Sequence, residues 1–147
     1  ALVSVKWVDK NKSGAVDIQN VADEIHLTFS RKLAESYKNN TASLSADVAN
    51  LFDALMIAND PDNPDQFVDF TTAGIASNTS IRIVGNDKII VIPLSNTFDD
   101  GVHTAGSYQF VAGRDKIAIA VDHGTIVDRA TPQNFCIASQ AVKILPQ

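Results

Sequence analysis

The amino-acid sequence predicts an α+β domain in which two N-terminal helices pack on a mostly antiparallel sheet that ends in a C-terminal β-meander. Two observations carry this prediction. Apolar residues recur at three- and four-residue spacings in the first part of the chain, and from residue 66 onward they fall in short runs between turn residues. Helices first and strands afterwards are typical of the α+β class. The 147 residues are expected to form one domain, spanning 1–147.

The N-terminal part is expected to contain one strand followed by the two helices. Apolar side chains alternate with period two over residues 3–8, which predicts a half-buried strand. Asp17 is then the expected N-cap of a helix of about twenty residues. Its apolar face would comprise Ile18, Val21, Ala22, Ile25, Phe29, Leu33 and Tyr37. The second helix would cover residues 44–55 and end before the proline-containing run 60–65.

The C-terminal part is expected to consist of strands and glycine-containing turns. The two expected hairpins are 81–84 with 88–93, and 107–112 with 116–122. The remaining strands are expected at 66–70, 125–127 and 135–145. The last of these is long and apolar and would offer a sheet edge for pairing between copies. The polar loop 95–106 is the candidate contact element.

Composition and charge exclude several function classes. The net charge is −5 and the longest cationic cluster is Arg31-Lys32, which argues against nucleic-acid recognition and against binding to an anionic membrane surface. Apolar runs are too short to span a bilayer. The single cysteine, Cys136, gives no disulfide framework. No nucleophile elbow, Walker loop or dinucleotide fingerprint is present, so we expect no catalytic residues and no enzymatic activity.

One short segment, "DKNKSGAVDIQN" at residues 9–20, resembles a calcium-binding loop. The expected side-chain ligands are Asp9, Asn11, Ser13 and Asp17. Residue 20, in the last loop position, is asparagine and cannot supply the bidentate carboxylate that such loops use. The pattern therefore favours a polar turn, and a weak calcium site is the alternative.

The segment "VGNDKIIVIPLSNTFDDGVHTAGSYQFVAGRDKIAIAVDHGTIVD", residues 84–128, belongs to a longer C-terminal stretch of about sixty residues. An apolar strand ending in proline, a polar loop and the sequence "SYQFVAGRDKIAIAVD" together resemble the closing part of tailed-bacteriophage major capsid proteins. The resemblance implies a structural, self-assembling protein of a virion that uses no cofactor and contacts copies of itself or other virion proteins. The alternative is a non-catalytic interaction domain in the cytoplasm, with or without a weak calcium-binding turn at residues 9–20.

Overall fold

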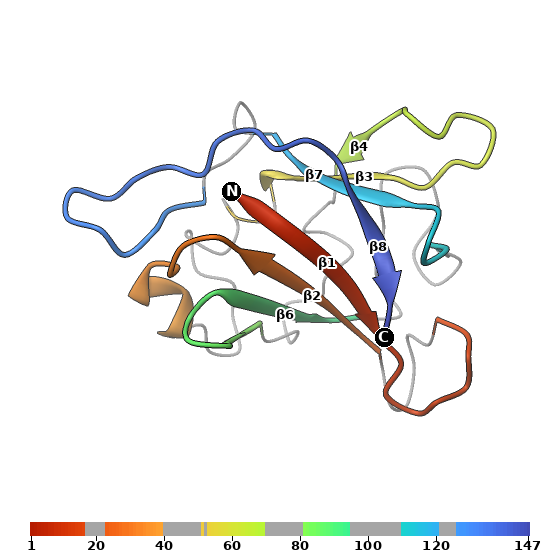
Figure 1. Cartoon of the computed structure of the whole chain (residues 1–147), viewed down its shortest axis with the longest axis horizontal. Coiled ribbons are helices and arrows are strands. Elements are labelled where there is room, and N and C mark those ends of the chain that lie inside the picture. Colours follow the sequence, from red (N-terminus) through yellow and green to blue (C-terminus); the bar gives the residue numbers. More distant parts are fainter. Residues whose placement is uncertain (17–22, 40–50, 52, 70–80, 95–109, 121–125) are drawn as a thin grey trace.

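The computed structural model describes residues 1–16, 23–39, 51, 53–69, 81–94, 110–120 and 126–147. These residues form a curled, mostly β structure (Figure 1). Its strands are β1 (Leu2–Val8), β2 (Glu24–Phe29), β3 (Leu55–Ala58), β4 (Val68–Asp69), β5 (Arg82–Val84), β6 (Ile89–Pro93), β7 (Lys116–Ile119) and β8 (Val142–Pro146). A single turn of 3-10 helix, η1 (Glu35–Asn39), lies between β2 and β3.

The strands join in one sheet with the order β4-β3-β7-β8-β1-β2-β6-β5. The first and last strands of the chain lie side by side at its centre, and β1 and β8 pair in parallel with Val5 opposite Ile144. Each of the other neighbouring pairs is antiparallel. Curling brings β3 and β7 to one side of this central pair and β2 and β6 to the other (Figure 1).

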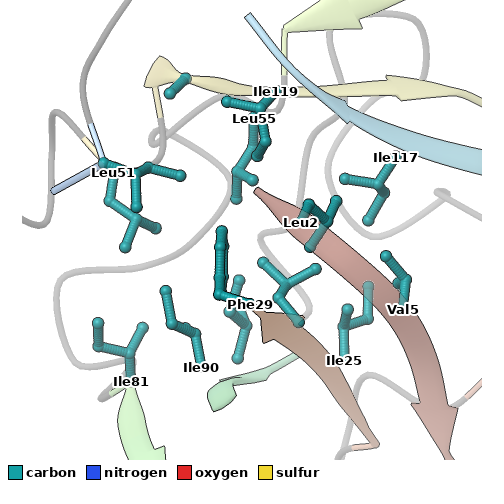
Figure 2. Packing of buried hydrophobic residues seen from close by; sticks show 14 of the residues in the cluster. Leu2, Val5, Ile25, Phe29, Leu51, Leu55, Ile81, Ile90, Ile117 and Ile119 are labelled. Atoms are coloured by element: carbon teal, nitrogen blue, oxygen red, sulfur yellow. The ribbon is translucent and has the colours of Figure 1, made fainter. Parts of the chain in front are cut away.

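The inner face of the curled sheet carries the core. In β2, β3 and β7 the alternate side chains that face the interior are buried, as the period of two in a strand requires. Figure 2 shows Val5 and Ile25 from one half of the sheet pointing into the same interior as Leu55 and Ile117 from the other. The core cluster combines aliphatic residues of the strands with others from the connecting segments, such as Leu33 and Ile126, and with three aromatic residues, Phe29, Tyr37 and Phe110. Because β-branched and aromatic side chains pack well on a pleated surface, this composition suits a sheet.

The predicted first helix is wrong, because residues 24–29 form strand β2. Ile25 and Phe29 satisfy the helical spacing, but Leu27 between them is also fully buried, whereas His26 and Thr28 are only partly buried. This alternation is that of a strand whose inner face meets the core. The N-cap Asp17 and the residues Ile18, Val21 and Ala22 lie outside the described residues.

The second predicted helix is wrong at its C-terminal end, where Leu55 is the first residue of strand β3. Leu51 and Asp53 have helical backbone, and the rest of 44–52 lies outside the described residues. The fold class is therefore not two helices packed on a sheet. Within the described ranges the protein is a curled mixed sheet with one short 3-10 helix.

The predictions for the C-terminal strands were partly correct. The hairpin of β5 and β6 is confirmed, and positive φ angles at Gly85, Asn86 and Asp87 form its turn. In the second expected hairpin, residues 110–112 do not form a strand, and residues 107–109 lie outside the residues that the structure describes. The expected edge strand 135–145 is also wrong. Its regular part is β8, which lies inside the sheet between β7 and β1 and leaves no edge for another copy.

Candidate protein-contact site

The most distinctive feature outside the core is the Asp128 loop, which we define as residues 126–137. In Figure 1 this segment forms a long blue loop that extends beyond the sheet. An isolated antiparallel bridge between Val127 and Phe135 closes it, and a second bridge between Leu33 and Asp128 attaches it to the segment after β2. The amide of Cys136 donates to the carbonyl of Ile126 at 2.6 Å, so both ends of the loop are paired.

Asp128 fixes the interior of the loop through its carboxylate. Oδ1 accepts the amides of Ala130 at 3.0 Å and Asn134 at 2.9 Å. Oδ2 accepts the Asn134 side-chain amide at 2.9 Å and Arg31 Nη1 at 3.2 Å. One carboxylate therefore satisfies four donors from three parts of the backbone. Such a network holds a loop in a single conformation although little of it is regular structure.

Hydrogen bonding controls the ionisation of this carboxyl group. The amide and the side chain of Asn134 favour the charged form and outweigh the opposing effect of desolvation, and Ala130 and Arg31 add to them. The pKa of Asp128 is therefore lowered below its ordinary value. At neutral pH the carboxylate is ionised and accepts all four hydrogen bonds.

Arg129 attaches the Asp128 loop to the rest of the molecule. Its Nη2 lies 2.6 Å from Asp87 Oδ2 in the β5–β6 turn and 2.9 Å from Glu35 Oε1 in η1. Its backbone amide donates to the carbonyl of Lys32 at 3.0 Å. A single guanidinium nitrogen thus bridges η1 and the β5–β6 turn, two segments that are distant in sequence.

The loop held in this way presents large apolar side chains to solvent. Phe135 is 68% exposed and Ile137 is 69% exposed, the highest values among the exposed large apolar residues of the described chain. Cys136 between them points inward and packs against the core cluster. The segment thus alternates as a strand does, but its apolar outer side has no covering partner among the described residues.

A small hollow lies beside Phe135. Its volume is about 50 Å³, and Phe29, Leu33, Ile126 and Phe135 form most of its apolar lining. Asp128, Asn134 and Arg31 form its polar rim. A hollow of this volume is too small for a cofactor. Apolar anchors surrounded by a polar rim are the arrangement found at the centre of protein interfaces.

The predicted calcium ligands lie elsewhere, and the structure describes three of the four. Asp9 Oδ1 accepts the amide of Ser13 at 3.1 Å and Oδ2 accepts the amide of Gly14 at 2.7 Å. Asn11 Oδ1 also accepts the amide of Ser13, at 3.0 Å. Asp17 lies outside the described residues. In the described ranges, no group of three or more histidine, cysteine, aspartate or glutamate side chains is arranged to hold a metal ion.

We expect calcium at millimolar concentration to produce no saturable heat in titration calorimetry and no rise in melting temperature. The loop is closed by its own amides, and the four predicted ligands supply only two formal negative charges, from Asp9 and Asp17. The variant Asp9→Ala should instead lower the melting temperature in buffer with or without calcium, because it removes two hydrogen bonds. A saturable calcium heat that this variant abolishes would contradict the prediction.

Sequence reasoning did not find the Asp128 loop. Residues 125–127 and 135–145 were expected to be plain strands, and the proposed contact element was 95–106, which lies outside the described residues. One signal was available in "DRATPQN" at residues 128–134, where aspartate, proline and asparagine are typical turn residues. The exposure of Phe135 could not be predicted from the sequence, because an apolar residue in an apolar run is normally buried.

Comparisons with protein-family models, with curated proteins and with solved structures each return no match. The resemblance of residues 84–128 to capsid proteins therefore stays a prediction. No helix among the described residues is long and apolar enough to cross a membrane.

Proposed function

We propose that this chain is a structural protein that assembles with copies of itself through the Asp128 loop, as a component of a virion or of a phage-derived particle. The observation that carries the proposal is the pair of exposed apolar side chains, Phe135 and Ile137, on a loop that is held rigid. Ordering an interface loop on association costs free energy, and a loop that is already ordered avoids that cost.

The chemistry of the loop favours contact with protein over catalysis. The carboxylate of Asp128 and the guanidinium of Arg129 are occupied by bonds within the fold, so they position the loop. The large apolar side chains of Phe135 and Ile137 remain exposed to solvent. The assignment to a virion rests on the sequence resemblance of residues 84–128, and the contact surface rests on the loop. A non-catalytic interaction domain for a different protein partner is the alternative.

The test is the mass of the chain in solution by light scattering, from micromolar to near-millimolar concentration. We expect the wild-type mass to rise with concentration, and we expect Phe135→Ser/Ile137→Ser to need a higher concentration to reach the same mass. Because hot-spot side chains carry most of the energy of an interface, the double variant should weaken association by at least roughly tenfold.

The matched control is Val111→Ser. Val111 is 47% exposed and lies outside the Asp128 loop. The substitution therefore removes exposed apolar surface at a different place. This variant should associate as the wild type does. A wild-type chain that stays monomeric at every concentration would refute self-assembly, and equal association of the double variant would assign the contact to another surface.

A further inference from the structure

The outer face of the sheet carries a band of cations that the sequence gives no sign of. Register places Lys6 opposite His26 on one side and opposite Leu145 on the other. His26 in turn lies opposite Val91, and Val91 lies opposite Arg82. These side chains share one face because paired residues of neighbouring strands point to the same side of a sheet. Most core residues of the same strands occupy the other face, although Val91, between His26 and Arg82, is also buried.

A second row of this face places two lysines directly against each other. Lys116 of β7 pairs with Lys143 of β8 in the antiparallel register. Like charges at directly opposite positions repel, with side chains roughly 5 Å apart. An ion pair with Asp65 offsets this repulsion at Lys116, because Oδ1 of Asp65 lies 2.8 Å from Nζ of Lys116. Lys143 and Lys6 are exposed, and neither has an ion-pair partner among the described residues.

We call Lys6, Arg82, Lys116 and Lys143 the basic band. The side chain of Glu24 in β2 lies on the same face, and its Oε1 is 2.9 Å from Nη2 of Arg82. Burial raises the pKa of Glu24, but hydrogen bonds from His26 and Arg82 outweigh that effect, so its pKa is lowered and it is ionised at neutral pH. The four cations outnumber the two carboxylates that form ion pairs with them, Glu24 and Asp65.

The acidic run at residues 60–65 has the complementary chemistry. It follows β3 and supplies three aspartates, of which Asp62 is exposed and has no ion-pair partner within the described structure. Asp60 fixes its shape, since Oδ1 accepts the amide of Asp62 and Oδ2 accepts the side chain of Asn63, each at 2.9 Å. The contact between Asp65 and Lys116 is an intramolecular example of the same pairing.

We infer that the basic band is a docking surface for the acidic loop 60–65 of a second copy of this chain. Because the band and the loop are different patches, the contact is head-to-tail, the type that builds rings or open arrays. Opposite charges on the two patches would orient one copy relative to the other and speed their association. The inference rests on the proposed self-assembly, but it concerns a surface distinct from the Asp128 loop, so the two are testable separately.

The first experiment uses a fluorescently labelled peptide, DPDNPD, which copies residues 60–65, titrated into the dilute full chain and followed by anisotropy. We expect saturable binding at about 50 mM salt and at least roughly tenfold weaker binding at about 500 mM salt, because surface charges are screened over a few ångströms there. The variant Lys6→Glu/Lys143→Glu should likewise weaken binding at least tenfold. The control Lys12→Glu/Lys32→Glu, with the same charge change at exposed positions outside the band, should bind nearly as the wild type does.

Equal binding by the two charge variants, or no binding at low salt, would overturn the inference. Tighter binding of a hexaglutamate peptide would assign the band to a different acidic partner and would also overturn it. Light scattering then separates the two proposals. Association that survives Lys6→Glu/Lys143→Glu but not Phe135→Ser/Ile137→Ser would leave the proposed function standing and refute the band. A wild-type chain that never associates would refute the proposed function, whatever the peptide does.

Discussion

Replacement of Leu27 with alanine is expected to lower the free energy of unfolding by about 2–5 kcal/mol, the range for removing a leucine side chain from a packed core. Leu27 is fully buried at the centre of β2, between the paired strands β1 and β6. Its neighbour Thr28 faces the other side of the sheet and is partly exposed. Thr28→Ala is the matched control and should cost less than about 1 kcal/mol, as most changes away from the core do.

This pair of variants separates a strand from the predicted helix. On the expected helix, Ile25 and Phe29 face the core and Leu27 lies off the apolar stripe, so its removal would cost little. On the strand, Leu27 belongs to the same inner face as both of them. Chemical denaturation followed by circular dichroism gives both values. A Leu27→Ala cost no larger than that of Thr28→Ala would contradict strand β2.

Asp128→Ala is expected to weaken self-association at least roughly tenfold, although no apolar contact atom is changed. The substitution leaves two amides and two side chains without their common acceptor. The loop then has to be ordered on association, and that cost reduces affinity. Light scattering measures the loss. A folded Asp128→Ala variant that associates as the wild type does would contradict the positioning role.

The same carboxylate predicts a pH dependence. Its pKa is lowered in the folded state, so the stability that it contributes is fully present above its ordinary value of about 4 and is lost as pH falls through the lower folded value. The difference in melting temperature between the wild type and Asp128→Asn should therefore be constant from about pH 7 to pH 5 and shrink below about pH 4. A difference that is unchanged at low pH would show that charge plays no part.

The sequence by itself determined the elements whose signals are local. Strand β1 follows from alternation over residues 3–8, and the β5–β6 turn follows from Gly85-Asn86-Asp87, because positive φ is a property of these residue types. The polar turn at residues 9–16 was also readable, since Asp9 accepts amides four and five residues further along the chain.

Tertiary structure alone decided the rest. Ile25 and Phe29 fit a helix and a strand equally well by spacing, and only the β1 and β6 neighbours of β2 selected the strand. Phe135 reads as a core residue, and only the hydrogen bonds of Asp128 place it on an exposed loop. The basic band is invisible in sequence, because its four cations are far apart in the chain and only strand pairing places them on one face of the sheet. Local patterns record conformational preference, whereas exposure and charge clustering depend on which strands become neighbours.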